Sequence, residues 1–444
     1  MRVSVVGTGY VGLVTGVCLA EKGHSVFCVD VDSQKIEKIN NGISPIYEPG
    51  LEELLVRNLR IKLNATLDLR QAILDTEVTM IAVGTPFDGE SIDLTYIRQV
   101  AAQIGDALKD KADYHLVIVK STVVPGTTDN IVLPILEERS GKKAGRDFGV
   151  GMNPEFLTEG VAVRDFMFPD RIVLGGIDEH SLSVLESLYR PFSNVRVVKT
   201  NNKSAEMIKY ASNALLATMI SFSNEIANLC ASIGDIDVVD VMSGVHMSNY
   251  LSFLLPNGEK VLAPIASFLM AGCGFGGSCL PKDVKALISH GQKEGVSMQL
   301  LEAVIQINEN QPHQMVSLLK EHFGSLRGLH VSILGLAFKP DTDDMRESPA
   351  IPIIRELLDQ GVVVKAYDPV AIREARRIFG DSIIFCETLS QVLADSQAVM
   401  LITRWDEFKN VPELLAQIQP QPIFIDGRRM LDKNSVAGYL GIGL

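Results

Sequence analysis

The first thirty residues constrain the fold of this chain more than any other segment. A short apolar run, residues 2–6, is followed by Gly7-Thr8-Gly9-Tyr10-Val11-Gly12, an apolar helical pattern over residues 13–22, and a second apolar run that ends at Asp30. A strand, a glycine-rich turn, a helix and a second strand with an acidic end make up the unit that binds dinucleotides. The segment therefore predicts a nucleotide-binding βαβ unit.

Each glycine of this turn has an expected task. Gly7 makes the tight turn, Gly9 lets backbone N–H groups approach a pyrophosphate, and Gly12 allows the helix to pack closely on the strand. Asp30 is expected to accept the ribose hydroxyls and to repel a 2′-phosphate, which favours NAD over NADP. Lys35 is a further candidate for a cofactor contact, although a cation there is also compatible with a 2′-phosphate. In the alternative interpretation, the three glycines serve only tight turns and bind no cofactor. That interpretation does not explain why the second strand ends at Asp30.

Three more apolar runs end in polar, turn-forming loops. Ligands of an open parallel sheet bind at the carboxyl ends of its strands, so Thr85, Thr122 and Glu155 are expected on the cofactor side. For each threonine, a capping or turn role is an equally good interpretation, and a glutamate after a proline can also be a solvated loop residue. The runs and their loops are residues 77–83 before Gly84-Thr85-Pro86, residues 115–120 before Ser121-Thr122, and residues 148–152 before Asn153-Pro154-Glu155-Phe156-Leu157.

A long helix is expected in the middle of the chain. Residues 203–233 show helical periodicity without glycine or proline, and Gly234 ends the pattern. Lys209 and Asn213 lie four residues apart, so they share one face of a largely apolar helix and are expected to point inward, although most helical lysines are solvated. Such a helix between two domains is also a common dimerisation surface, which predicts a homodimer or a higher homo-oligomer.

One of the six cysteines stands in a glycine-rich loop, Gly274 to Asp283. Cys279 is followed by Lys282 and Asp283, and a thiol beside a cation and a carboxylate can be ionised as a nucleophile and served by a proton-transfer group. Cys273 lacks these partners and is expected only to pack. The six cysteines show neither disulfide nor zinc spacing, so they are expected to be reduced thiols, and no metal site is predicted.

The last third repeats the nucleotide-binding pattern without a complete GxGxxG. Its apolar runs end near Lys339, Arg428 and Arg429, which suit a diphosphate. The predicted fold is α/β, with two Rossmann-like doubly wound domains joined by a long central helix and a helical dimerisation region. Two nucleotide folds with the cysteine and lysine on the segment between them predict one active-site cleft. The expected domains are residues 1–199 (NAD binding), 200–318 (central, with the cysteine loop) and 319–444 (the second nucleotide-binding fold).

Composition excludes some classes of partner. A chain of 444 residues is expected to form two or three domains, and a net charge of −13 argues against a nucleic-acid or anionic-membrane partner. No uninterrupted apolar run is expected to span a bilayer, and the first strand begins too early for a signal peptide. A soluble, cytoplasmic protein is predicted.

These motifs together resemble the UDP-glucose/GDP-mannose dehydrogenase family of nucleotide-sugar 6-dehydrogenases. The resemblance runs along the whole chain and rests on Gly7–Gly12, Tyr47-Glu48-Pro49-Gly50, Val83–Pro86, Ser121-Thr122, Asn153–Leu157, Gly274–Asp283, and Asp341–Ser348 with Arg346. It implies oxidation of a primary C6 alcohol to a carboxylate through two hydride transfers to two NAD molecules.

The resemblance also implies roles for individual residues. Cys279 would be the nucleophile that forms a thiohemiacetal and then a thioester, and Lys209, with Asn213 beside it, would stabilise negative charge on the C6 oxygen. Asp283 and Glu155 would handle protons and the hydrolytic water, directly or through Thr122. NAD contacts are implied at the fingerprint, including Tyr10 and Val11, and at Lys282 and Arg346. Substrate contacts are implied at Glu155, Phe156, Leu157, Lys209, Asn213, Phe275, Gly276, Phe338, Lys339 and Arg428.

The motifs favour the UDP-glucose branch over the GDP-mannose branch, which stays the alternative. Arg404-Trp405-Asp406-Glu407-Phe408 and Phe424 to Arg429 look like the former. One segment departs from the family: Ser248 to Ala271 is longer than usual and contains Lys260 but no arginine, so it is expected to alter the sugar pocket or the dimer seam. Two further alternatives are a single-step hydroxyacid dehydrogenase, which would need no such cysteine, and a catalytically silent nucleotide-sugar sensor.

Overall fold

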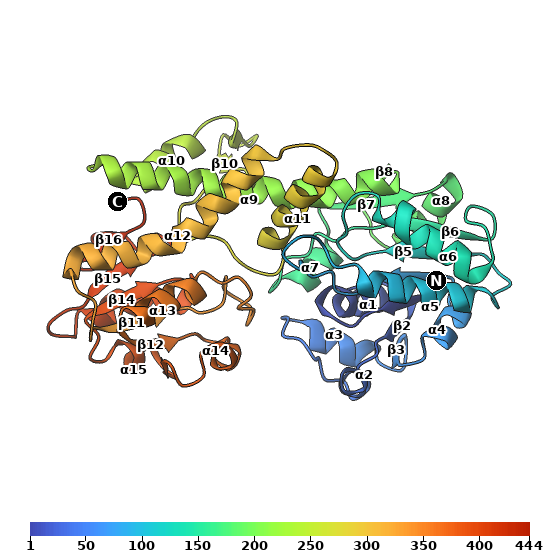
Figure 1. Ribbon diagram of the computed structural model, residues 1–444, viewed down its shortest axis with the longest axis horizontal. Helices are drawn as coiled ribbons and strands as arrows, with labels where there is room; N and C mark the ends of the chain where they lie inside the picture. Colours follow the sequence, from blue (N-terminus) through green and yellow to red (C-terminus); the bar gives the residue numbers. More distant parts are fainter. The chain divides into compact units, whose positions relative to one another are not determined.

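The computed structural model describes residues 1–444, which divide into two compact units, Met1–Ser212 (unit 1) and Asn213–Leu444 (unit 2). Each unit is built around one large β-sheet (Figure 1). Helix α9 (Asn202–Ile233) begins in unit 1 and continues into unit 2. The predicted α/β class with two Rossmann-like sheets and a long central helix is confirmed, whereas the division at residues 199 and 318 stays a prediction.

The sheet of unit 1 has eight strands in the order β3-β2-β1-β4-β5-β6-β7-β8. Strands β1 to β6 are parallel, as expected, but β7 runs antiparallel to β6, and β8 is parallel to β7. The connection from β6 to β7 is long enough for a strand of either direction, so the apolar pattern alone does not predict the reversal. The strands are β1 (Arg2–Val6), β2 (Ser25–Val29), β3 (Leu63–Thr66), β4 (Val78–Ile81), β5 (His115–Val119), β6 (Phe148–Met152), β7 (Arg171–Gly176) and β8 (Arg196–Thr200).

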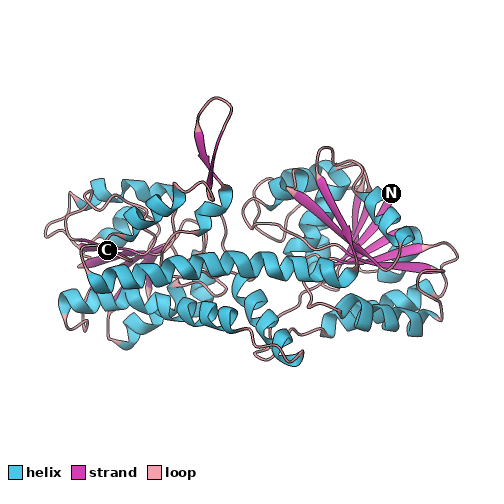
Figure 2. Ribbon diagram, turned by 90° about the horizontal axis from the view of Figure 1, so that it is seen from above, coloured by secondary structure: helices cyan, strands magenta, loops and turns pink.

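Helices cover both faces of this sheet (Figure 2). Leu116 and Ile118 of β5 belong to a core that includes α1 and α3, and Val117 and Val119 belong to another that includes α5 and α6. Successive strand residues point to opposite faces, so an uninterrupted apolar run fills both cores. The helices are α1 (Tyr10–Glu21), α2 (Ser33–Asn40), α3 (Leu51–Asn58), α4 (Leu69–Asp75), α5 (Thr95–Leu108), η1 (Thr128–Val132), α6 (Leu133–Ser140), α7 (Ala162–Met167) and α8 (Glu179–Leu188).

Unit 2 contains a second sheet, of six parallel strands in the order β13-β12-β11-β14-β15-β16. Helices α12 and α13 pack on one face, and α15, η3 and α16 pack on the other. The strands are β11 (His330–Leu334), β12 (Val363–Tyr367), β13 (Ile384–Phe385), β14 (Ala398–Leu401), β15 (Ile423–Asp426) and β16 (Tyr439–Gly441). The helices are α10 (Val238–His246), η2 (Pro264–Phe268), α11 (Leu280–Lys293), α12 (Gln299–Phe323), α13 (Ala350–Asp359), α14 (Ile372–Phe379), α15 (Leu389–Leu393), η3 (Asp406–Asn410) and α16 (Val411–Leu415).

The segment Ser248 to Ala271, for which a departure from the family pattern is predicted from the sequence, contains a β-hairpin. Strands β9 (Ser252–Leu254) and β10 (Lys260–Leu262) pair antiparallel and stand away from the rest of unit 2 (Figure 2). Their side chains Phe253, Leu254 and Leu262 are exposed.

Helix α9 corrects one expectation about membranes. By length and composition it is apolar enough to cross a membrane, so the expectation that no segment qualifies is wrong. Core helices of soluble proteins meet the same criterion, and α9 carries the buried polar side chains Glu206, Lys209 and Asn224.

Candidate active site

The glycine-rich turn of unit 1 is shaped to admit a ligand. Helix α1 begins at Tyr10, three residues earlier than expected, because Gly9 serves as its N-cap. A Cβ at Gly12 would lie 1.8 Å from the carbonyl oxygen of Gly7, whereas a Cβ at Gly9 would meet nothing within 4 Å. Gly7 has a φ of +99°, which a side chain would disfavour. Gly7 and Gly12 are thus required by packing, and Gly9 leaves open space before a helix N-terminus, which suits a pyrophosphate.

Asp30 follows the end of β2 beside this turn. Its Oδ2 accepts hydrogen bonds from the Thr8 backbone N–H (2.7 Å) and the Thr8 hydroxyl (2.6 Å). Burial alone would raise the pKa of Asp30, but these hydrogen bonds, a third from Asp32 and the charge of Lys35 hold it below the usual value. Asp30 is therefore ionised near neutral pH, as an acceptor for ribose hydroxyls must be.

Two more sequence motifs meet around the same end of the sheet in unit 1. The Thr85 hydroxyl donates to the carbonyl of Thr122 at 2.8 Å, so the loops after β4 and β5 are joined. The Tyr10 hydroxyl donates to Glu48, whose carboxylate also accepts from the backbone N–H of Gly160 and of Ala162, both at 2.7 Å. The Tyr47–Gly50 motif thus ties the fingerprint helix to the loop that follows β6.

Glu155 and Lys209 form a buried ion pair. Lys209 Nζ lies 2.9 Å from Glu155 Oε1, and both side chains are about 5% exposed. Burial raises the pKa of Glu155, but the charge and hydrogen bond of Lys209 more than offset this and hold the pKa below its usual value. The Leu157 N–H donates to the other Glu155 oxygen at 2.6 Å, and the Phe156 ring lies against Arg171 and Lys209. The predicted inward orientation of Lys209 is confirmed.

A second buried lysine behind this pair was not predicted from the sequence. Lys120, which follows β5, donates to Asn153 Oδ1 at 2.9 Å, and the Tyr189 hydroxyl donates to the same oxygen. Burial lowers the pKa of Lys120 to about 8, with Glu155 raising it and Lys209 lowering it further. Lys120 therefore holds the loop that carries Glu155 and adds positive potential near Lys209. Only its position at a strand end could have drawn attention to it.

In unit 2, Cys279 lies at the N-terminus of helix α11. It is the N-cap residue, and it is the one cysteine of the six that is not buried. A helix N-terminus favours the thiolate because of the unpaired N–H groups and the helix dipole. Cys273, by contrast, is fully buried, burial raises the pKa of its thiol, and the expectation that it only packs is confirmed.

Asp283 lies one turn further along α11 and is 1% exposed. Its Oδ1 accepts from Lys282 Nζ at 2.6 Å, and its Oδ2 accepts from Asn213 Nδ2 at 2.6 Å. The Asp283 N–H donates to the Cys279 carbonyl at 2.9 Å. Asn213, Lys282 and Asp283 are therefore brought together beside the thiol.

The loop before Cys279 is held by close contacts. The amide of Asn308 on α12 brackets Phe275, accepting from its N–H at 2.8 Å and donating to its carbonyl at 3.0 Å. Added Cβ atoms at Gly276 and Gly277 would lie 2.2 Å from Glu347 O and 2.7 Å from the Phe338 ring, respectively. The Gly277 N–H donates to the Arg346 carbonyl at 2.8 Å, while the Arg346 guanidinium lies on Asp344. A role of Arg346 in binding NAD stays a prediction.

A cavity of about 260 Å³ opens next to this loop within unit 2. It contains the predicted substrate residues Phe275, Gly276, Phe338, Lys339 and Arg428. Arg404 and Thr403 line it as well. Arg404 was noted in the sequence only as part of the motif that favours the UDP-glucose branch, and neither residue was predicted to bind the substrate. Nowhere in residues 1–444 do three or more His, Cys, Asp or Glu side chains gather to hold a metal ion.

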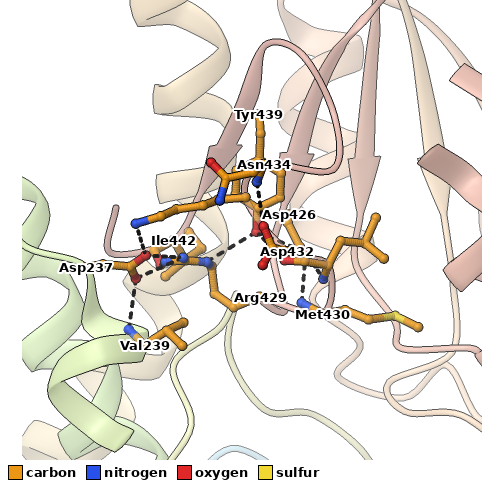
Figure 3. A network of polar contacts seen from close by, with 11 residues as sticks. Asp237, Val239, Asp426, Arg429, Met430, Asp432, Asn434, Tyr439 and Ile442 are labelled. Carbon is orange, nitrogen blue, oxygen red and sulfur yellow. Dashed lines mark hydrogen bonds and ion pairs between the residues drawn. The ribbon is translucent and has the colours of Figure 1, made fainter. Parts of the chain in front are cut away.

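Arg429 does not share the orientation of Arg428. Its guanidinium forms a buried ion pair with Asp237 at 2.9 Å and donates to the Ile442 carbonyl (Figure 3). Asp237 is also the N-cap of α10, so this pair fastens α10 to the loop after β15. The expectation that Arg429 joins Arg428 in a diphosphate site is wrong, because consecutive side chains on this loop point in different directions.

Three family models describe this arrangement. The NAD binding domain of the UDP-glucose/GDP-mannose dehydrogenase family matches residues 1–193, its central domain matches residues 203–310, and its UDP binding domain matches residues 332–433. The chain belongs to the UDP-glucose/GDP-mannose dehydrogenase family. It is therefore an NAD-dependent oxidoreductase with an N-terminal NAD-binding domain and a C-terminal nucleotide-sugar-binding domain.

Relatives in this family resemble the chain over its full length. A UDP-glucose 6-dehydrogenase of Haloferax volcanii is 42% identical, covering 99% of each chain, and one of Bacillus subtilis is 43% identical, covering 99% of this chain and 92% of the relative. A GDP-mannose 6-dehydrogenase of Pseudomonas aeruginosa is 37% identical, covering 97% and 96%. The solved structure of a UDP-glucose dehydrogenase from the hyperthermophilic archaeon Pyrobaculum islandicum superposes with a TM-score of 0.90 at 38% identity, covering 99% of this chain and 97% of that one.

Variants at the second and third glycines of the fingerprint, Gly9 and Gly12, allow packing and cofactor binding to be separated. Gly12→Ala is expected to destabilise unit 1 by about 3 kcal/mol, because its Cβ overlaps the Gly7 carbonyl. Gly9→Ala is expected to leave the thermal unfolding midpoint nearly unchanged and to weaken NAD binding about tenfold or more, because its Cβ enters the space before α1. Calorimetric unfolding and NAD titration check both, and equal NAD affinity of Gly9→Ala and the wild type would contradict the assignment.

Lys120 predicts a pH-dependent difference in stability. Because its pKa in the folded chain is about 8, against 10.5 as the ordinary value, the unfolded chain binds more protons between these values. The stability of the wild type relative to Lys120→Met is therefore expected to rise from pH 8 to pH 10, by up to about 3 kcal/mol. Thermal unfolding at a series of pH values measures it, with exposed Lys109→Met as the matched control; a constant difference between wild type and Lys120→Met would refute it.

Proposed function

We propose that this chain is a UDP-glucose 6-dehydrogenase, which oxidises the C6 alcohol of UDP-glucose to the carboxylate of UDP-glucuronate. The observation that carries the proposal is the position of Cys279: a half-buried thiol at a helix N-terminus, one turn from the buried Asp283. A simple alcohol dehydrogenase has no use for such a thiol. The UDP-glucose 6-dehydrogenases of Haloferax volcanii and Bacillus subtilis, at 42% and 43% identity, support the choice of sugar.

The overall reaction balances with two NAD⁺ and one water. One alcohol, two NAD⁺ and one water are converted to one carboxylate, two NADH and three protons. NAD⁺, when bound, would accept the hydride in each oxidation. In the first oxidation the C6 hydroxyl loses a proton and C6 loses a hydride, which leaves an aldehyde. Lys209, held by Glu155 at 2.9 Å, is the cation that we assign to stabilise negative charge on the C6 oxygen.

Cys279 keeps the aldehyde on the enzyme for the second oxidation. Its thiolate adds to C6 to form a thiohemiacetal, and loss of a second hydride converts this to a thioester. Water then attacks the thioester carbon, and the thiol leaves to regenerate Cys279. Asp283 and Glu155, with Thr122, are the groups assigned to move the protons of these steps. Asn213 and Lys282 hold the Asp283 carboxylate in one orientation while it does so.

Stoichiometry tests this mechanism. Purified wild type with UDP-glucose is expected to form two NADH per sugar, followed at about 340 nm, where reduced nicotinamide absorbs. Cys279→Ser is expected to lower turnover at least about a thousandfold, because the covalent intermediate is lost. Cys273→Ala, which removes a buried thiol six residues away, is the matched control and keeps the ratio of two.

Three outcomes would contradict the proposal. Full turnover by Cys279→Ser would refute covalent catalysis. One NADH per substrate would point to a single-step dehydrogenase. A preference for GDP-mannose over UDP-glucose would show that GDP-mannose is the substrate. GDP-mannose is the second candidate because the chain is 37% identical to the GDP-mannose 6-dehydrogenase of Pseudomonas aeruginosa.

A cytoplasmic homodimer is the assembly we propose. The six cysteines are all unpaired, as in a reducing compartment. Within unit 2, helix α9 exposes Leu215, Phe222 and Leu229, which are 52%, 47% and 56% exposed and are spaced seven residues apart. Apolar side chains at this spacing form one stripe along a helix, which is suited to pack against a second copy of the same helix.

Light scattering tests the dimer. The wild type is expected to have twice the mass of one chain, and the double variant Phe222→Glu and Leu229→Glu is expected to be a monomer, because it buries charge in the stripe. Val296→Glu, an exposed apolar position outside α9, is the matched control and should stay dimeric. An unchanged mass of the double variant would exclude the stripe as the interface.

A further inference from the structure

The cavity of unit 2 has an unusual charge for this chain. Among its fifteen lining residues are the three cations Lys339, Arg404 and Arg428, and there is no aspartate or glutamate. The whole chain carries a formal net charge of −13. A cavity lined by three cations in a chain of negative net charge is suited to bind an anion.

Arg404 and Arg428 are joined to each other by hydrogen bonds. Arg404 follows the end of β14, and its Nε donates to the Arg428 carbonyl at 2.9 Å, with Nη2 donating to the same oxygen. The Arg428 Nε and Nη1 donate to the carbonyls of Ile402 (2.6 Å) and Gly274 (2.8 Å). Backbone carbonyls therefore fix both guanidinium planes, and Nη1 of Arg404 and Nη2 of Arg428 remain without a protein acceptor.

No carboxylate forms an ion pair with either arginine. The nearest candidate, Asp426, accepts from the backbone N–H groups of Arg428, Met430 and Leu431 and from the Tyr439 hydroxyl. Neither Arg404 nor Arg428 makes an ion pair within 4.0 Å, whereas the neighbouring Arg429 is paired with Asp237 (Figure 3). Two partly buried like charges without a counter-charge are costly, so a ligand of opposite charge would stabilise them.

We propose that Arg404 is a further diphosphate-binding residue of the nucleotide substrate site, acting next to Arg428. The inference rests on the proposed function only in identifying the ligand as a nucleoside diphosphate. Two guanidinium groups held next to each other suit two adjacent phosphates, since each keeps one Nη that can donate charge-assisted hydrogen bonds to phosphate oxygens. The rings of Phe275 and Phe338 in the same cavity suit the flat or apolar parts of such a ligand.

The protonation of Arg404 is consistent with this role. Burial lowers the pKa of Arg404, and the charge of Arg428 lowers it further, while Asp426 raises it in part. The negative charge of a bound diphosphate would oppose the effect of Arg428 and favour the charged form of Arg404. The same charges would make the affinity for a nucleoside diphosphate fall as salt concentration rises, because the cavity opens to solvent.

The test compares UDP with uridine, which lacks the phosphates, by titration calorimetry on the full chain. Arg404→Gln is expected to raise the Kd for UDP about 10- to 100-fold, because the variant loses one group that donates charge-assisted hydrogen bonds. Uridine binding, measured by competition, is expected to change less than about threefold. Arg404→Lys should lie between wild type and Arg404→Gln, and Arg377→Gln, which removes an exposed guanidinium paired with Glu374, is the matched control.

The outcomes separate charge recognition from a folding defect. UDP affinity of Arg404→Gln equal to that of the wild type would overturn the inference, and so would equal losses for UDP and uridine, which indicate a disturbed loop. The midpoint of thermal unfolding without ligand identifies the second case. A wild type that binds UDP through Arg404 but forms no NADH from UDP-glucose would overturn the proposed function and leave this inference standing.

Discussion

The cost of burying charge determines how this chain arranges its polar side chains. Lys209 lies on Glu155, Arg429 lies on Asp237, and Asp283 is held between Lys282 and Asn213. Removing one member of such a buried pair leaves a charge without a partner, at a cost of several kcal/mol. Each pair therefore fixes its side chains before any ligand arrives, which is what preorganised catalysis requires.

Two partly buried arginines in the cavity of unit 2 lack such a partner, and we propose that the chain depends on its substrate at this position. Arg404 and Arg428 are oriented by backbone carbonyls, which set their geometry but do not cancel their charge. The two arginines thus supply the positive charges of an ion pair, and in our proposal the ligand supplies the negative charges. The same loop after β15 supplies both kinds of arginine, Arg428 toward the cavity and Arg429 toward α10.

Local patterns predicted most of the framework. The fingerprint, the strand ends and the long helix could be located because each depends on residues near in sequence, as when Gly12 meets the carbonyl of Gly7. The reversed strand β7 could not, since an apolar run has no direction. Arg429 was misplaced and Lys120 and Arg404 were missed for one reason: their roles depend on partners at least 24 residues away, Asp237, Asn153 and the Arg428 carbonyl.

The hairpin β9–β10 stands away from the rest of unit 2 (Figure 2). Its tip, Asn257-Gly258, has open space around it, and a Cβ at Gly258 would meet nothing within 4 Å. Exposed loop tips of small residues tolerate insertion, because no buried hydrogen bond is broken. The tip is therefore a position where a fluorophore, an affinity tag or a whole guest domain can be grafted while the Cys279 loop keeps its supports.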